Sequence, residues 1–103
     1  MRVIVFFDLP TDTAKDRRNY NKFRRNLIND GFIMLQESVY SKLALNGSIA
    51  NSIKEKLKKY KPPKGLVQML IITEKQYSSI EFITGEKNQS IIENTERTII
   101  LWN

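Results

Sequence analysis

A chain of 103 residues, 41% of them hydrophobic and only four of them Gly, has the size and composition of one globular domain. It contains neither Cys nor His, which excludes disulfides, thiolate chemistry, the commonest general base and the commonest transition-metal ligand. The formal net charge of +6 favours an anionic partner, and nucleic acid is the first candidate.

The positive charge is concentrated in the first two thirds of the chain. Residues 1–64 hold 14 of the 17 Lys and Arg residues but only 6 of the 11 Asp and Glu residues. We therefore expect the anion-binding surface in this part of the chain. The longest apolar run, residues 3–7, is too short to span a bilayer, and no signal-peptide pattern precedes it. These features predict a cytoplasmic protein with no membrane partner.

The chain opens with a predicted strand and a predicted helix. Residues 2–7 are mostly β-branched and aromatic without polar alternation, which is typical of a central strand covered on both faces. A turn at Pro10 ends this strand. Thr13 and Asp16 then form a capping-box pattern, which begins a helix of about eighteen residues that ends at Asp30. The apolar face of this helix consists of Tyr20, Phe23 and Leu27.

A hairpin and a second helix are predicted next. Residues 33–35 and 38–45 are strand-like and are separated by the polar pair Gln36-Glu37, which indicates one hairpin or one bent strand. Asn46 is a preferred residue at the start of a helix, and the Pro62-Pro63 pair ends the helix that follows. The apolar face of this second helix consists of Ile49, Ile53, Leu57 and Tyr60.

The last third of the chain contains three further predicted strands. Residues 66–73 are almost continuously apolar, which predicts a second central strand. Residues 80–84 form a short predicted strand, and residues 98–102 form a terminal strand. We therefore expect a core domain over residues 1–84 and a C-terminal extension over residues 85–103, within a single domain overall.

The order of these elements predicts the fold class. The sequence β, α, β, β, α, β matches the ferredoxin-like arrangement, an α+β fold in which an antiparallel sheet carries both helices on one face. The other face of the sheet then lacks a cover, although the strands at residues 2–7 and 66–73 are apolar on both sides. A second copy of the chain would supply that cover, so we expect a homodimer.

The first predicted helix carries a strip of basic residues opposite its apolar face. At 100° per residue, four cations fall within about 80° of one another. These four are Lys15, Arg18, Lys22 and Arg25, with Arg17 and Arg24 on the flank. Spaced cations of this kind can follow a phosphate backbone without reading bases. The alternative is a solvated helix face, but such faces usually mix both signs of charge.

Further lysines on the second helix and its exit either extend this patch or serve only solubility. They are Lys54, Lys56, Lys58, Lys59, Lys61 and Lys64.

Asp8 is the candidate catalytic and metal-binding residue, because it stands at the end of the first predicted strand. The alternative is that Asp8 braces the turn that follows, since Asp is a preferred turn residue. One carboxylate cannot hold a Mg²⁺ ion unaided. Two Asp8 side chains near the axis of a dimer could do so.

Several motifs in the first 84 residues resemble the second family of CRISPR-associated (Cas) proteins, the small partner of the spacer-acquisition integrase. The motifs are Val3-Ile4-Val5-Phe6-Phe7-Asp8-Leu9-Pro10, Tyr20, Phe23-Arg24, Gly31-Phe32 and Gln36-Glu37-Ser38-Val39-Tyr40. The sequence is similar to the branch found in type II CRISPR loci in Asp12-Thr13-Ala14-Lys15-Asp16-Arg17, Leu35 to Tyr40 and Pro62-Pro63-Lys64-Gly65.

This resemblance implies a homodimer whose sheets pack together and whose C-terminal strand crosses to the partner. The expected dimer or partner interface is therefore Ile99, Ile100, Leu101 and Trp102. The resemblance also implies that the dimer lies between two dimers of the CRISPR integrase subunit and holds a captured double-stranded DNA fragment, the prespacer. Members are described as Mg²⁺-dependent endonucleases acting on RNA or double-stranded DNA, with Asp8 as the matching metal ligand.

Two functions from different classes remain open on the sequence. The first is a DNA-binding adaptation subunit that uses its basic strip, and the second is a Mg²⁺-dependent nuclease that uses paired Asp8 residues. The absence of His and the single strand-end carboxylate favour the first. An RNA-binding module of the RRM kind is disfavoured, because the sequence lacks that motif and core packing explains the strand aromatics Phe6, Phe7 and Tyr40.

Overall fold

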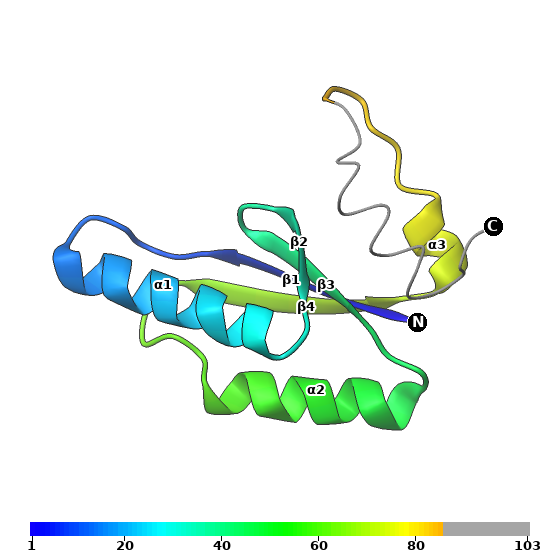
Figure 1. Cartoon of the computed structure of the whole chain (residues 1–103), viewed down its shortest axis with the longest axis horizontal. Helices are drawn as coiled ribbons and strands as arrows, with labels where there is room; N and C mark the ends of the chain where they lie inside the picture. Colours follow the sequence, from blue (N-terminus) through cyan, green and yellow to red (C-terminus); the bar gives the residue numbers. More distant parts are fainter. Residues whose placement is uncertain (86–103) are drawn as a thin grey trace.

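The computed structural model describes residues 1–85, which form a four-stranded antiparallel sheet with helices on it (Figure 1). Along the chain the elements are β1 (Arg2–Asp8), α1 (Ala14–Asn29), β2 (Ile33–Gln36), β3 (Val39–Leu43), α2 (Gly47–Lys59), β4 (Leu66–Ile72) and α3 (Glu74–Ser78). The strands lie in the order β2-β3-β1-β4, and every neighbouring pair is antiparallel. This is the predicted ferredoxin-like α+β arrangement.

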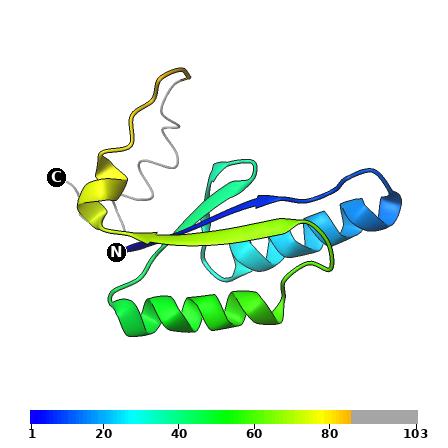
Figure 2. The ribbon, with the colours of Figure 1, turned by 180° about the vertical axis from the view of Figure 1, so that it is seen from behind.

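The two long helices cover one face of the sheet and enclose the core, as Figures 1 and 2 show from opposite sides. Because side chains alternate along a strand, Val3, Val5 and Phe7 of β1 all point toward the helices, and all three are buried. The Phe7 ring meets the Phe23 ring of α1 edge-on at a centroid distance of 5.2 Å, and stacks on Tyr40 of β3 at 5.8 Å. These contacts lock α1 onto the sheet.

The opposite face of the sheet is covered at one end by α3. Arg2 points to this face and is only 1% exposed. Its Nε donates to both carboxylate oxygens of Glu74 at 3.1 Å, and its guanidinium lies 4.3 Å from the centre of the Tyr77 ring. The Tyr77 hydroxyl is 3.3 Å from Oγ of Ser41 on β3. The short helix is therefore held to the sheet by a buried cation.

Helices α1 and α2 begin at the capping residues that the sequence predicted. Thr13 and Asp16 form a full capping box at the start of α1, and the Asn46 side chain accepts from the amide of Ile49 at the start of α2. Helix α1 is 16 residues long, slightly shorter than expected. It ends before Gly31, whose φ of 93° is the left-handed conformation that glycine adopts most readily.

Residues 33–43 form a hairpin, which decides between the two interpretations that the sequence left open. Strands β2 and β3 pair antiparallel, and the register shifts between Met34 and Gln36. The extra residue there is a β-bulge, which bends the strand and increases its twist.

Strand β4 was predicted to be central, and that prediction is wrong for the described residues. It lies at the edge of the sheet and pairs only with β1. Leu66 and Leu70 are both more than half exposed. The error has a physical cause, because an apolar run shows that both faces of a strand need a cover but does not show how many neighbours pair with its edges.

The predicted strand at residues 80–84 is also wrong. The chain forms α3 after β4, and residues 79–85 contain no strand. A capping box of Thr73 and Gln76 begins α3, so the sequence did contain a signal for this helix. The predicted terminal strand at residues 98–102 lies outside the described residues.

None of the helices within residues 1–85 is long and apolar enough to cross a membrane.

Candidate nucleic-acid interface

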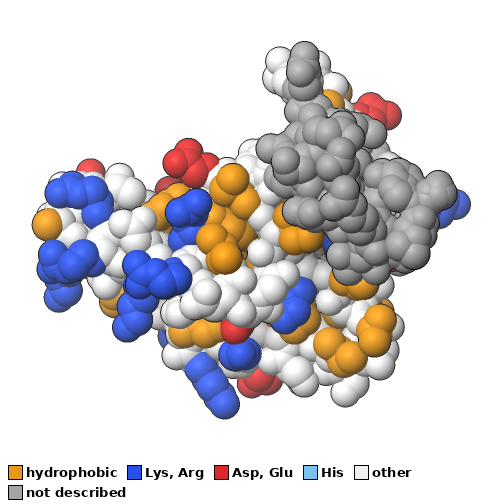
Figure 3. All heavy atoms as spheres, viewed as in Figure 1, with side chains coloured by type: hydrophobic (Ala, Val, Ile, Leu, Met, Phe, Trp, Pro, Cys, Tyr) orange, Lys and Arg blue, Asp and Glu red, His pale blue; other side chains and the backbone are white. Residues whose placement is uncertain are grey.

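Four cations of α1 point into solvent and form a continuous strip along the helix. The members of this basic strip are Lys15, Arg18, Lys22 and Arg25, and all four are exposed. Within residues 1–85 none of them forms an ion pair or a side-chain hydrogen bond. Figure 3 shows Lys and Arg side chains gathered over α1. Their charge is therefore free to meet a ligand.

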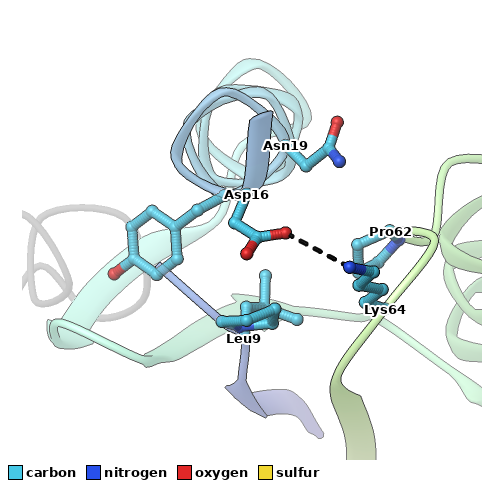
Figure 4. Close-up of a pocket in the computed structure, with 7 residues that line it drawn as sticks. Leu9, Asp16, Asn19, Pro62 and Lys64 are labelled. Atoms are coloured by element: carbon cyan, nitrogen blue, oxygen red, sulfur yellow. Dashed lines mark ion pairs between the residues drawn. The ribbon is translucent and has the colours of Figure 1, made fainter. Parts of the chain in front are cut away.

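The acidic residue in the body of α1, Asp16, is turned away from the basic strip. It is only 7% exposed, and its backbone amide donates to Oγ1 of Thr13 at 3.0 Å. Lys64, which follows α2, reaches across so that its Nζ lies 3.8 Å from Oδ1 of Asp16 (Figure 4). The cavity at this point has a volume of about 10 Å³, which is at most enough for one water molecule. Asp16 is thus a structural residue, and it leaves the strip uncompensated.

The two flanking arginines of α1 make contacts within the chain. One Nη of Arg17 donates to the carbonyl oxygens of Thr11 and Asp12 at 3.1 and 3.3 Å, which braces the loop before the helix. Nε of Arg24 donates to the Tyr40 hydroxyl at 2.8 Å, and this arginine is half-buried. Within the described part of the chain, the structure therefore separates the six predicted cations of α1 into four without a side-chain partner and two that are anchored by hydrogen bonds.

The lysines of α2 differ from those of α1 because several of them have acidic neighbours. Nζ of Lys56 lies 2.9 Å from Oδ1 of Asp30 at the end of α1, and Nζ of Lys58 lies 3.2 Å from Oε2 of Glu55. Together with the pair between Lys64 and Asp16, these contacts compensate much of the positive charge around α2. The α2 surface is therefore a weaker anion site than the basic strip.

The ionisation of Asp30 reflects these neighbours. Partial burial works against its charge, but the hydrogen bond from Lys56 and the positive charges of Lys56 and Lys42 outweigh it and lower the pKa of Asp30. The Tyr60 hydroxyl is buried nearby without a well-formed hydrogen bond, so we attribute the stabilisation of the carboxylate mainly to Lys56. Burial, and then the Asp30 carboxylate, raise the pKa of Tyr60.

Asp8 lies at the end of β1, on the sheet face opposite α1 and α2, and its side chain is exposed. It stands opposite Leu66 of β4 and has no ion pair or side-chain hydrogen bond within residues 1–85. The backbone around it is closely packed, because a Cβ on Gly65 would lie 2.7 Å from the Asp8 carbonyl oxygen. Gly65 also has a φ of 94°, so both space and conformation require glycine there.

The described residues 1–85 do not by themselves form a magnesium site around Asp8. Within residues 1–85 no three acidic side chains come together. Mg²⁺ takes six oxygen ligands and is usually held by one or two carboxylates together with substrate phosphates. A single Asp8 carboxylate supplies too few ligands by that measure, and residues 1–85 supply no second carboxylate beside it. The predicted interface residues Ile99, Ile100, Leu101 and Trp102 lie outside the described residues.

Sequence reasoning missed two groups of residues that the structure brings together. The first is the cluster of Arg2, Glu74 and Tyr77, which joins residues far apart in the chain and has no local pattern. The second is a groove beside α1 in which Asn21 and Glu37 face the same space. No signal in the sequence points to either group, because each depends on the packing of separate elements.

The sheet order and the two helices on one face define a ferredoxin-like α+β domain, and one of these helices carries an exposed strip of cations. The family described as CRISPR associated protein Cas2 matches residues 1–80. The chain belongs to this Cas2 family of CRISPR-associated proteins, as the resemblance in its motifs predicted.

Individual relatives agree with this assignment over almost the whole chain. A Treponema denticola protein named "CRISPR-associated endoribonuclease Cas2" is 52% identical over 98% of this chain and 100% of its own length. A Ligilactobacillus salivarius protein of the same name is 46% identical, with the same coverage of both chains. The crystal structure of Streptococcus pyogenes Cas2 at pH 6.5 matches with a TM-score of 0.62 at 18% identity, covering 82% of this chain and all of that chain. At that identity the likeness shows the shared fold alone.

Proposed function

We propose that this chain is the adaptation subunit of a CRISPR system, a homodimer that bridges two integrase dimers and binds prespacer duplex DNA through phosphate contacts. The observation that carries the proposal is the basic strip, in which Lys15, Arg18, Lys22 and Arg25 are exposed and unpaired within residues 1–85. Free cations on a rigid helix are the arrangement that releases counterions from a nucleic-acid backbone. The integrase as partner follows from membership of the family and the resemblance of the motifs.

The spacing of the strip suits a duplex. Lys15 and Arg25 are ten residues apart, which corresponds to about 15 Å along a helix axis. That length corresponds to roughly four base pairs of B-DNA, so the strip can contact several consecutive phosphates. The strip itself offers no side chain that reads base edges, so binding through it would be independent of sequence.

The sheet face opposite α1 and α2, which α3 covers only at one end, supports a dimer. Ile4 and Phe6 of β1 point to this face beside Leu66 and Leu70 of β4, which are 55% and 53% exposed. An apolar surface of this kind on a sheet, with an unpaired edge strand next to it, is best covered by another protein surface. A second copy packed there would bring two basic strips into one particle and place two Asp8 side chains on the buried side.

The DNA contact is tested by the salt dependence of binding. Removing one phosphate contact lowers the slope of log K against log salt by about 0.9 for duplex DNA, so Arg18→Ala with Arg25→Ala is expected to reduce the slope by about 1.8. The matched control is Lys58→Ala with Lys59→Ala on α2, which removes the same charge from the other helix and is expected to change the slope much less. An equal slope for the α1 variant and the unmodified protein contradicts the proposal.

The dimer and its partner are tested on the full chain. Sedimentation at micromolar concentration is expected to show a dimer, and Leu66→Ser with Leu70→Ser is expected to weaken it, because both side chains are exposed on the sheet face opposite α1 and α2. Deleting residues 98–103 is expected to weaken the dimer or the binding of the integrase subunit. A monomeric full-length protein would rule out the bridging role.

A second candidate function is a Mg²⁺-dependent endonuclease acting on RNA or double-stranded DNA. Two observations favour it: relatives that are 42–52% identical are named endoribonucleases, and Asp8 is exposed at a strand end without a partner within residues 1–85. The activity would require a second copy, because one chain supplies a single carboxylate there.

Asp8→Asn separates the two functions. The nuclease hypothesis requires that this variant lose Mg²⁺ binding, measured by calorimetry, and cleavage, while DNA affinity is kept because the basic strip is untouched. The adaptation hypothesis requires that the same variant still support insertion of a prespacer when the integrase is present. We expect insertion to survive. Loss of insertion by a variant that is folded, dimeric and able to bind DNA would favour a catalytic role for Asp8.

A further inference from the structure

A groove lies between α1 and the β2–β3 hairpin, directly beside the basic strip. Its volume is about 480 Å³, within the range of roughly 300 to 1,000 Å³ that is usual for small-molecule sites. The lining residues are Tyr20, Asn21, Arg24, Met34 and Glu37. The hairpin stands beside α1 in Figures 1 and 2, and the Tyr20 hydroxyl joins the two elements by donating to the Glu37 carbonyl oxygen at 3.4 Å.

The walls of this groove offer a flat cation and an apolar surface. Nε of Arg24 is fixed by the Tyr40 hydroxyl at 2.8 Å, so the guanidinium plane is held in place. Its two Nη groups form no hydrogen bond or ion pair within residues 1–85. Met34, which is 38% exposed, presents an apolar thioether to the same groove. A planar aromatic ring can stack on a guanidinium and against a thioether at the same time.

The rim of the groove offers hydrogen-bonding groups suited to the edge of such a ring. Asn21 is exposed and carries both an amide donor and an amide acceptor, and Glu37 is exposed and carries a carboxylate that only accepts. Neither side chain has a hydrogen-bond partner within residues 1–85. The negative charge of Glu37 disfavours a phosphate inside the groove and favours a neutral ring that bears amino groups.

The groove lies next to the basic strip around the circumference of α1. Asn21 is four residues from Arg25 and three from Arg18, which places it about 40° and 60° from them around the α1 axis. A strand whose phosphates lie on the strip would therefore carry its bases past the mouth of the groove. A base paired inside a duplex could not enter, because its edges are occupied and its faces are stacked.

We propose that this groove binds one unpaired nucleobase of a nucleic-acid strand whose phosphates lie on the basic strip. The base stacks on Arg24 and Met34, and Asn21 and Glu37 contact its edge, so that adenine and cytosine, which carry exocyclic amino groups, are preferred over thymine. The proposal rests on the proposed DNA contact of α1. It adds that the subunit distinguishes a strand end or a gap from continuous duplex.

The test compares three forms of one labelled DNA by fluorescence anisotropy with the full chain. They are a blunt duplex, the same duplex with a single-stranded deoxyadenosine overhang, and the same duplex with an abasic overhang of equal length. The unmodified protein is expected to bind the deoxyadenosine overhang about fivefold or more tightly than the abasic one, the smallest gain expected from one stacked base. A deoxythymidine overhang is expected to lie between the two.

Substitutions of the groove residues test whether the unpaired base binds in the groove. Asn21→Ala and Met34→Ala are expected to remove most of the preference for the base over the abasic overhang and to leave blunt-duplex affinity unchanged. Asn29→Ala is the matched control, because Asn29 is also an exposed asparagine of α1 but does not line the groove. Circular dichroism of each variant confirms that the fold is retained.

The outcomes separate this inference from the proposed function. Equal affinity for the base and abasic overhangs overturns the groove while leaving the basic strip intact. An unchanged preference in both Asn21→Ala and Met34→Ala places the base elsewhere and also overturns it. If Arg18→Ala with Arg25→Ala leaves blunt-duplex binding and its salt dependence unchanged, the proposed function fails by itself.

Discussion

Helices α1 and α2 lie on the same face of the sheet and are both rich in cations, yet their cations are in different situations. In α1 the four strip residues form no ion pair within the described residues 1–85, because Asp16 is buried in the capping box and faces Lys64. In α2 Lys56 and Lys58 each lie within 3.2 Å of a carboxylate oxygen. Within residues 1–85 the two helices thus differ in how many of their cations are already paired, and we expect this difference to decide which helix binds an anion.

Arg2 differs from the cations of both helices because its side chain is buried. Replacing Arg2 by Ala removes the contacts to Glu74 and Tyr77 and leaves space under α3, so we expect the free energy of unfolding to fall by about 2 to 3 kcal/mol. Urea denaturation measures this. The salt slope of DNA binding is expected to stay unchanged, since this cation faces no ligand. A stability equal to that of the unmodified protein would show that α3 is not held by Arg2.

Reversing charge on the two helices tests their difference directly. Lys22→Glu with Arg25→Glu on α1 is expected to weaken binding of blunt duplex more than tenfold, or about 1.4 kcal/mol or more, because attraction is replaced by repulsion at two contacts. Lys58→Glu with Lys59→Glu on α2 makes the same change in net charge. Anisotropy titrations at one salt concentration compare the two variants. Equal reductions in affinity would mean that only the net charge matters and that the strip has no special role.

Asp30→Asn removes the carboxylate that holds Lys56. The pKa of Asp30 is lowered below its usual value of 3.8, so its charge stabilises the fold at pH values above the pKa of the unfolded chain. This contribution disappears as pH falls through the lower pKa of the folded state. We expect a loss of less than about 1 kcal/mol at neutral pH, since Lys56 is well exposed. The difference should vanish in strong acid, and denaturation at several pH values checks this.

Glu55→Gln has the smallest expected effect on stability and on DNA affinity. It tests the comparison of the two helices by freeing a paired cation of α2. It frees Lys58 from its partner at i−3 on α2 and is expected to lower stability by no more than about 0.5 kcal/mol. If the ion pair with Glu55 limits the contact of Lys58 with DNA, the affinity for duplex DNA should rise slightly, by less than about twofold. Thermal unfolding and anisotropy on the same sample measure both quantities. A fall in DNA affinity would show that pairing does not restrain Lys58.

The helices and most strands could be predicted because their signals are local. The capping box of Thr13 and Asp16, the spacing of Phe23 and Leu27, and the Pro62-Pro63 pair each act within a few residues of the chain. The predicted strand at residues 80–84 failed although the Thr73 and Gln76 pattern before α3 was equally local. In that case apolar β-branched residues were interpreted as strand formers, whereas Ile80 and Ile83 are exposed.

The position of β4 and the division of the α1 cations required the tertiary structure. An apolar run does not specify an edge, because a strand can be apolar on both faces with only one neighbour beside it. Helical spacing placed Arg24 on the flank of the strip. Only the packing of β3 against α1 brings the Tyr40 hydroxyl within 2.8 Å of Nε of Arg24. The same packing makes Arg24 a lining residue of the groove.

The sequence by itself determined the charge, the order of the elements from β1 to β4 and the family, because composition and short-range patterns carry that information. Tertiary structure decided which cations are free, where Arg2 is buried and which side chains share a groove. The physical reason is that ion pairs, burial and cavities depend on distances between residues far apart in the chain. Arg2 and Glu74 are 72 positions apart, and only folding brings them into contact.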